Sequence, residues 1–309
     1  MRKGELSVED SATKKKFRFK GERTASTLVI VGVLAVYVVS IHLNIHWLYT
    51  TITALVAAAI CYELIHVVGC ESKLLFGLSM AVSAGYVFTV GFHITIPHFQ
   101  VILSFYLLLL LTLAVLDHRR IRFLHAIMAF FASVCVTYAL SCFIRLNDLP
   151  YLNGRFTHLE GLFLFWLSFT CSWVTDVFAF LVGRKIGKHK MTPVISPKKS
   201  WEGAVFGTLI TAAINVLVLL GYTLVATKLM GRSMFWMESP IKYLYIIPVS
   251  VLLSVVGMFG DLSASLLKRN LGIKDFSNLL PGHGGIVDRF DSCLFVLPVL
   301  YGIFSLIYG

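Results

Sequence analysis

Charged residues are scarce in this chain of 309 residues: Asp, Glu, Lys and Arg make up 14% of it, whereas apolar residues make up 57%. Soluble domains average about 25% charged and about 45–50% apolar residues. The mean hydropathy is +0.81. These proportions exclude a soluble globular domain, a collagen-like chain and a disordered chain. The composition that remains is that of a membrane protein with many spanning segments.

Paired cysteines are also lacking, since no C-x-x-C motif occurs. The six cysteines lie in or beside apolar runs: Cys61, Cys70, Cys135, Cys142, Cys171 and Cys293. This distribution argues against a zinc knuckle and against a disulfide framework. We expect buried free thiols, because cysteine commonly packs as a small apolar side chain.

Nine apolar runs are long enough to cross a bilayer, which takes about 17–25 residues per helix. They cover residues 25–43, 47–69, 74–92, 96–116, 123–144, 161–183, 203–226, 243–260 and 293–309. Backbone groups inside a bilayer must satisfy one another, so each run is expected to be a helix. The sequence therefore predicts an all-α polytopic membrane protein with about nine transmembrane helices.

Basic residues predict the orientation of these helices, because Lys and Arg are enriched in cytosolic loops. With the N-terminus in the cytosol, 22 of the 27 Lys and Arg fall on the cytosolic side. We expect three regions: a basic cytosolic tail (1–24), an N-terminal bundle of five spans (25–160) and a C-terminal catalytic region of four spans (161–309). The formal net charge of +11 thus indicates topology and phosphate binding, with no nucleic-acid partner.

Two acidic residues, Glu63 and Asp176, fall inside the expected spans, both toward the cytosolic side. A charged side chain at the centre of a membrane helix costs about 2.5–3.5 kcal/mol, so such a residue suggests function. For Asp176 we favour a functional role, because a basic loop follows directly. For Glu63 we favour a polar contact between helices.

The loop at 183–203 carries six Lys or Arg against one Glu and contains the stretch S-P-K-K-S-W-E-G. It is no Walker A loop, because Lys188 is followed by His189 instead of Ser or Thr. A cationic loop of this kind suits polyphosphate or lipid phosphate.

The loop at 261–292 combines carboxylates, cations and glycines. Asp288 and Asp291 are three residues apart and would share a helix face; with Asp261 they suit a hard cation such as Mg²⁺. Glycines let backbone N–H groups approach phosphate oxygens closely. These are the parts of a phosphoryl- or nucleotidyl-transfer site, although from the residues alone a cation transporter stays open.

Residues 265–291, S-L-L-K-R-N-L-G-I-K-D-F-S-N-L-L-P-G-H-G-G-I-V-D-R-F-D, resemble the signature of phosphatidate cytidylyltransferases. Asp176, the G-R and G-K pairs at 183–188 and S-P-K-K-S-W-E-G resemble that family too, so the resemblance covers residue 172 onward. It implies transfer of the cytidylyl group of CTP to phosphatidic acid, giving CDP-diacylglycerol and pyrophosphate, with divalent metal.

The resemblance also implies roles for individual residues. We expect a site with two Mg²⁺ ions held by Asp176, Asp261, Asp288 and Asp291, with Lys268 and Arg269 beside them at the catalytic centre. The expected substrate-binding residues are Arg184, Lys188, Ser196, Lys198, Lys199, Lys274, His283, Gly284, Gly285 and Arg289. For His283 a role confined to shaping the loop stays open.

The expected partners are CTP, phosphatidic acid and lipid of the inner leaflet, with the active site on the cytosolic side of a bacterial inner membrane. A homodimer is compatible with the sequence, which does not determine the oligomeric state. A CTP-dependent lipid kinase of the polyprenol type is the main alternative, and a cation transporter is a weaker one. The step of three from Asp288 to Asp291 excludes the CDP-alcohol phosphotransferases, whose final acidic pair is four apart.

Overall fold

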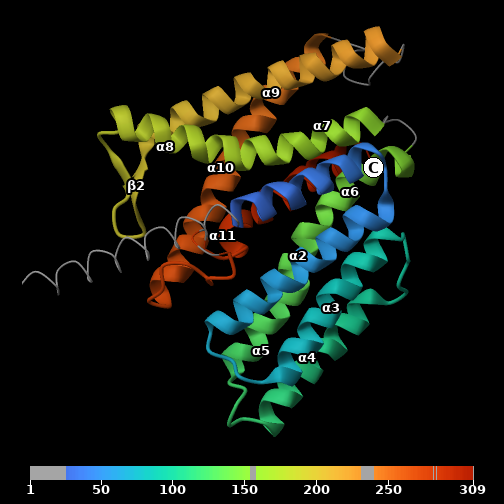
Figure 1. The fold of residues 1–309 in the computed structure, drawn as a ribbon, viewed down its shortest axis with the longest axis vertical. Coiled ribbons are helices and arrows are strands. Elements are labelled where there is room, and N and C mark those ends of the chain that lie inside the picture. Colours follow the sequence, from blue (N-terminus) through green and yellow to red (C-terminus); the bar gives the residue numbers. More distant parts are fainter. Residues whose placement is uncertain (1–25, 154–157, 231–239, 281, 283, 309) are drawn as a thin grey trace, which may run out of the picture.

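The computed structural model describes residues 26–153, 158–230, 240–280, 282 and 284–308, and most of them are helical (Figure 1). An apolar helix at Ser26–His42 comes first. It is followed by α2 (His46–Val67), α3 (Lys73–Gly91), α4 (Phe99–Leu116), α5 (Phe123–Phe130), the π-helical turn η1 (Phe131–Val136), α6 (Thr137–Asn153), α7 (His158–Phe169), the π-helical turn η2 (Thr170–Val174), α8 (Thr175–Ile186), α9 (Trp201–Met230), α10 (Pro240–Asn270), α11 (Val287–Phe290) and α12 (Cys293–Tyr308).

Seven continuous helical stretches in the described part of the chain are long and apolar enough to cross a membrane. Two shorter apolar helices, Ser26–His42 and Cys293–Leu306, coincide with the first and last expected spans. The prediction of an all-α polytopic membrane protein is therefore confirmed. The count of nine and the cytosolic N-terminus stay predictions, and the basic tail at 1–24 lies outside the described residues.

The helices form one packed assembly in which α8 lies along α9, α10 crosses both, and α2 lies along α3 (Figure 1). Helix α6 packs against α7 and α12, so the two transmembrane regions expected from the sequence are in contact. The hairpin strand β2 and the short helix α11 lie toward the same end of the assembly (Figure 1). We call this end, with its loops 187–200 and 271–292, the hairpin end.

Hydroxyl and amide groups join α8, α9 and α10 inside the apolar bundle. The Thr175 hydroxyl lies 3.0 Å from that of Thr211 and 2.9 Å from that of Ser254. The Asn215 amide donates to the Ser250 hydroxyl at 3.0 Å. Hydrogen bonds of this kind between membrane helices contribute roughly 0.6 kcal/mol each. They hold α8 and α10, which carry Asp176 and Asp261, against α9.

The stretch between α8 and α9 differs from the irregular loop that the sequence indicates. It forms an antiparallel hairpin of β1 (Lys190–Thr192) and β2 (Ser196–Ser200). Glu202 connects the two ends of the hairpin. Its carboxylate accepts a hydrogen bond from the backbone N–H of His189 at 3.1 Å and lies 2.6 Å from Nδ1 of the His189 ring. The S-P-K-K-S segment is thus a strand with a defined register.

Two smaller expectations also change in the structure. Five of the cysteines are buried free thiols as expected, but Cys135 is exposed on the outside of the bundle. The helix predicted to end at residue 144 continues through α6 to Asn153, so that Arg145 and Asp148 lie on a helix instead of in a loop.

A close approach of α8 and α9 yields a test of this packing. A Cβ atom on Gly207 would lie 2.8 Å from the Ala179 backbone nitrogen, whereas one on Gly221 of the same helix would meet nothing within 4 Å. We expect Gly207→Ala to lower the free energy of unfolding by about 1–3 kcal/mol through overpacking. Gly221→Ala is the matched control and should leave it unchanged or higher. The measurement is the thermal unfolding of both purified variants in detergent. Equal stability of the two variants would contradict the close packing of α8 and α9.

Candidate functional site

Three carboxylates from separate elements converge at the hairpin end. Asp176 lies on the first turn of α8, directly after the π-helical turn η2, and Asp261 lies in the second half of α10. Asp291 follows α11 and is 8% exposed. Such π-helical turns are frequent at functional sites. The structure thus brings together three of the four predicted metal ligands.

A lysine from the hairpin lies between two of these carboxylates. The Lys199 ammonium is 2.5 Å from Asp261 Oδ2 and 3.9 Å from Asp176 Oδ1. Its side chain is 18% exposed, so the pair of contacts is largely shielded from water. The cation compensates charge that would otherwise be costly in this partly desolvated place. Lys199 lies on β2 between the paired residues Ser196 and Ser200, where the register of the hairpin shifts.

Ser292 connects the remaining carboxylate to the site, and the sequence reasoning missed it. Its hydroxyl donates to Asp176 Oδ2 at 2.8 Å, and its backbone N–H donates to Asp291 Oδ1 at 2.8 Å. Burial, together with the nearby carboxylate of Asp261, raises the pKa of Asp291 to about 7. A carboxylate in this setting binds a proton or a cation readily, because either one relieves the repulsion.

Asp288, the fourth predicted ligand, has other partners in the structure. Lys268 donates to its Oδ1 at 2.6 Å, while the backbone N–H groups of Phe276 and Gly285 each donate to Oδ2 at 3.0 Å. Asp288 thereby folds the loop between α10 and α11 onto itself. To reach a metal ion, its Oδ1 would have to leave Lys268.

Glu63 holds the same loop from the other side. Its Oε1 accepts from the Ser277 hydroxyl at 2.5 Å and from the Ile286 backbone N–H at 2.9 Å, and its Oε2 accepts from the Val287 N–H at 2.8 Å. Glu63 is completely buried. The structural role predicted for it is consistent with these contacts, but its partners belong to the loop before α11 and to the first residue of α11 instead of a neighbouring membrane helix. This contact connects α2 to a segment more than 200 residues away in the chain.

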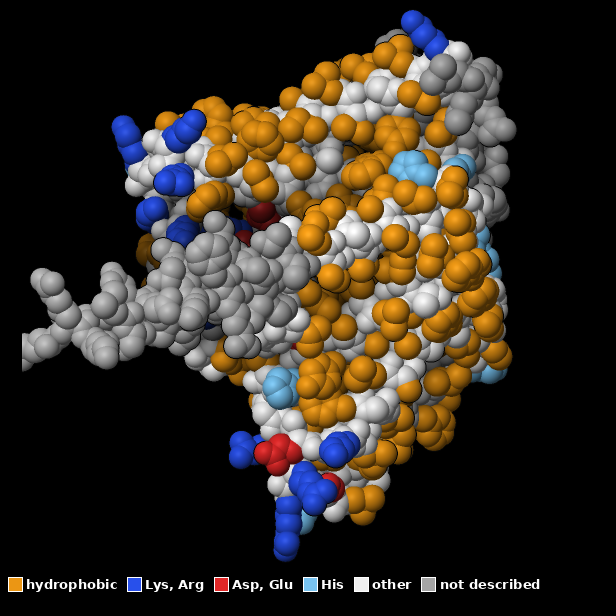
Figure 2. Space-filling view, viewed as in Figure 1, with side chains coloured by type: hydrophobic (Ala, Val, Ile, Leu, Met, Phe, Trp, Pro, Cys, Tyr) orange, Lys and Arg blue, Asp and Glu red, His pale blue; other side chains and the backbone are white. Residues whose placement is uncertain are grey.

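The remaining predicted site residues surround this core. Lys and Arg side chains gather at the hairpin end, with acidic side chains recessed among them (Figure 2). Six of the predicted basic residues are exposed: Arg184, Lys188, Lys198, Arg269, Lys274 and Arg289. The guanidinium of Arg269 donates to the Ile195 carbonyl at 3.4 Å and so contacts the hairpin. Gly284 has a positive φ of 80°, and His283 lies outside the described residues.

One cavity is lined by two of the carboxylates, and a second contains residues that neighbour them in the chain. One of about 190 Å³ is lined by Asp176, Asp261, Ser196, Lys198 and Lys199, among others. A second of about 240 Å³ has a nearly all-apolar lining that includes Trp173 and Phe290 and ends at Arg289. The Trp173 indole N–H donates to the Arg289 carbonyl at 3.0 Å, which holds this boundary in place. The apolar cavity thus contains Trp173, three residues before Asp176, and Phe290, next to Asp291.

The donor set of the charged pocket fits a hard divalent cation. Carboxylate oxygens are the ligands that Mg²⁺ takes in proteins. The Lys199 ammonium contacts two of the three carboxylates, and Ser292 links the third, Asp291, to Asp176. That ammonium marks the place where positive charge is stabilised. Asp176, Asp261 and Asp291 are the residues that would hold such an ion.

Comparisons with known proteins identify the family of the chain. A phosphatidate cytidylyltransferase of Bacillus subtilis (strain 168) is 36% identical over 202 residues, which cover 65% of this chain and 66% of the relative. One of Staphylococcus saprophyticus subsp. saprophyticus is 38% identical over 192 residues, covering 62% and 64%. The chain thus spans slightly less than two thirds of the length of these relatives. Residues 21–307 match the cytidylyltransferase family over nearly the whole sequence, and the chain belongs to that family.

Proposed function

We propose that this chain transfers the cytidylyl group of CTP to phosphatidic acid, giving CDP-diacylglycerol and pyrophosphate. The observation that carries the proposal is the combination of a pocket lined by carboxylates and lysines with an apolar cavity whose lining includes Trp173, three residues before Asp176, and Phe290, next to Asp291. The relatives bear the name phosphatidate cytidylyltransferase, which agrees with this reaction. We place the site on the cytosolic side of a bacterial inner membrane, where 22 of the 27 basic residues are expected. A homodimer stays a prediction.

In the proposed reaction a phosphate oxygen of phosphatidic acid attacks the α-phosphorus of CTP. A bond forms between that oxygen and the α-phosphorus, while the bond from the α-phosphorus to the bridging oxygen of the β-phosphate breaks. The leaving group departs as pyrophosphate with the electron pair of that bond. The second pKa of a phosphate monoester is about 6, so the nucleophile is already ionised near pH 7 and needs little help from a base.

The main barrier is then the approach of two polyanions, which the site is equipped to lower. Lys198 and Lys199 line the pocket and would bind phosphates of CTP. Arg269, Lys274, Arg184 and Lys188 extend this positive surface, and Ser196 adds a hydroxyl. Preorganised cations of this kind stabilise charge that develops on the transferring phosphoryl group.

The lipid would enter from the side, through the apolar cavity. Its walls include Trp173 and Phe290, which suit an acyl chain, and Arg289 at its edge suits the phosphate. This arrangement would place the lipid phosphate at the same loop as Asp291. The depth of the carboxylates near the membrane surface matches a substrate whose head group stays at that level.

Mg²⁺ is the proposed cofactor, and when bound it would neutralise phosphate charge and help to orient the reacting oxygens. We assign its ligands as Asp176, Asp261 and Asp291, with Ser292 orienting two of them. The expectation of a second cation and of Asp288 as a ligand stays a prediction. In the contacts described above, Asp288 and Lys268 instead shape the loop that carries Asp291.

The carboxylate assignment can be tested with a single isosteric change. We expect Asp261→Asn to lower kcat for CDP-diacylglycerol formation by about 10²–10³-fold, because one ligand charge and the partner of Lys199 are lost together. The measurement is product formation from CTP, phosphatidic acid and Mg²⁺ by the purified protein, with pyrophosphate release followed in parallel. Glu71→Gln, which changes an exposed acid in another loop, is the matched control. Full activity of Asp261→Asn would refute the assignment, and release of CDP in place of pyrophosphate would indicate a kinase.

The anchoring contact of Glu63 makes it a positioning residue with its own test. Glu63→Gln keeps the volume but turns one acceptor into a donor facing N–H groups, which should cost about 1–3 kcal/mol of stability. Because the loop it holds leads to Asp291, we expect kcat to fall by about 10–100-fold in a protein that still folds. Ser277→Ala removes one donor alone and should have a smaller effect. A Glu63→Gln enzyme with unchanged kcat would show that the loop does not depend on this contact.

A further inference from the structure

A second cluster of ligating side chains lies at the opposite end of the bundle from the hairpin. His46 begins α2, and Glu63 lies 17 residues further along the same helix, about 25 Å away at 1.5 Å per residue. His93 follows α3, and Asp148 lies near the end of α6. This cluster is therefore separate from the residues proposed to carry out nucleotidyl transfer.

One ligand atom from each of His46, His93 and Asp148 lies within 4.8 Å of the other two. Within the described ranges no other group of His, Cys, Asp and Glu side chains was brought so close together. His46 Nδ1 lies 4.0 Å from Asp148 Oδ1, and His93 Nε2 lies 3.7 Å from Asp148 Oδ2. These distances are too long for hydrogen bonds. They are close to the separation of about 3.4 Å between ligands that lie 2.0–2.1 Å from one tetrahedral ion.

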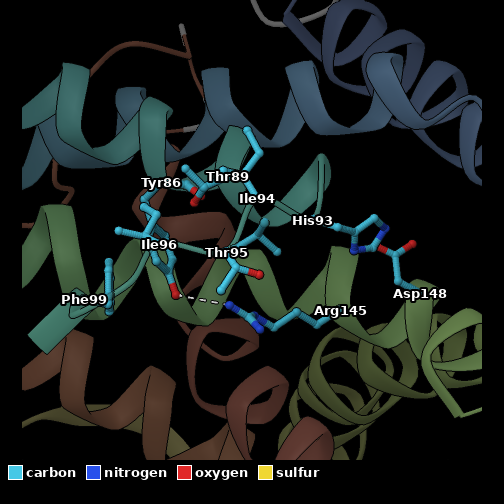
Figure 3. Close-up of a pocket in the computed structure, with 10 residues that line it drawn as sticks. Tyr86, Thr89, His93, Ile94, Thr95, Ile96, Phe99, Arg145 and Asp148 are labelled. Atoms are coloured by element: carbon cyan, nitrogen blue, oxygen red, sulfur yellow. Dashed lines mark hydrogen bonds and ion pairs between the residues drawn. The ribbon is translucent and has the colours of Figure 1, made fainter.

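The carboxylate of Asp148 is the group in the cluster whose charge is not fully compensated by hydrogen bonds. Its side chain is 2% exposed, and Oδ2 has no hydrogen-bond partner among the described residues. A buried carboxylate oxygen without a partner is costly, and buried charges are ordinarily paired or bound to a metal. Oδ2 and His93 Nε2 face each other across a gap that a cation would fill (Figure 3).

Neighbouring groups hold the cluster in place. The Tyr49 hydroxyl lies 2.6 Å from His46 Nδ1 and donates to Asp148 Oδ1 at 3.3 Å, while the Asn147 amide donates to Tyr49 at 3.3 Å. Groups of this kind around a metal site orient its ligands and tune their basicity. If His46 Nδ1 binds an ion, the Tyr49 hydroxyl keeps Asp148 as its acceptor.

We propose that His46, His93 and Asp148 form a binding site for a first-row divalent transition-metal ion, with Zn²⁺ as the representative ion. Two imidazoles and one carboxylate suit Zn²⁺ and its neighbours, whereas Mg²⁺ and Ca²⁺ take oxygen ligands. The three ligands come from the beginning of α2, the end of α3 and α6, so a bound ion would tie these helices together.

The site leaves a coordination position that is accessible from outside the bundle. His93 and Asp148 both line a cavity of about 350 Å³ that also includes Arg145, Tyr86 and Phe99 (Figure 3). Three protein ligands with an open fourth position are typical of zinc sites that bind water or an anion. The guanidinium of Arg145, which donates to the Tyr86 hydroxyl at 3.4 Å, supplies positive charge beside that position.

The chain offers a closely matched pair of variants for the test. His93 and His98 lie in the same connection between α3 and α4, and both have a φ of 54°. Asparagine tolerates this left-handed conformation, so His93→Asn and His98→Asn carry the same backbone strain. Only His93 belongs to the cluster.

The experiment is equilibrium dialysis of chelator-treated, full-length protein in detergent against Zn²⁺, with excess Mg²⁺ to occupy oxygen-ligand sites. Bound metal is counted by mass spectrometry. We expect wild type and His98→Asn to bind one Zn²⁺ per chain more than His93→Asn and Asp148→Asn. Zn²⁺ should also raise the thermal unfolding midpoint of wild type and His98→Asn but not of His93→Asn. Equal Zn²⁺ content in the His93→Asn and His98→Asn proteins would overturn the proposal. This comparison tests the proposal even if the Asp148→Asn protein does not fold.

Discussion

The contact of the Lys199 ammonium with the carboxylates of Asp176 and Asp261 is the interaction on which the hairpin end depends. Acids from α8, α10 and the segment before α12 meet where water is partly excluded. Their repulsion must be compensated by a cation. The hairpin supplies that cation in the structure, and the same geometry explains why the site would bind a divalent ion and phosphate together.

The second constraint is the placement of the loop before α12. Glu63 and Asp288 act as acceptors for backbone N–H groups and for Ser277 and Lys268, and together they hold the loop from two sides. Buried carboxylates are tolerable where every oxygen has a donor. The acids near the hairpin end therefore have two roles: some converge on a candidate cation site, and others hold the backbone that carries it.

Much of this arrangement could be predicted from the sequence, for physical reasons. Apolar runs of membrane length predict helices because no other backbone form is satisfied in a bilayer, and the structure confirms a polytopic helical protein. The two loops were found because clustered charges and glycines stand out in a charge-poor chain. Their convergence could be expected only through the family resemblance, since spacing along the chain says nothing about which loops meet.

Other features had no signal in the sequence. The contacts of Lys199 with two carboxylates, the bridge made by Ser292 and the partners of Asp288 all depend on contacts between distant segments. The apolar run ends near residue 144, which predicts a loop at residue 148, yet the helix continues and buries Asp148. Polar residues at helix ends are therefore the least predictable part of such a chain.

The account is tested most directly by following the phosphorus atoms of CTP. Purified protein is supplied with phosphatidic acid, Mg²⁺ and CTP that carries a radioactive label at either the α- or the γ-phosphate. Cytidylyl transfer predicts that the α-label appears in the lipid product and that the γ-label appears in pyrophosphate. Transfer of the γ-label to lipid, with the α-label remaining in CDP, would contradict the central claim.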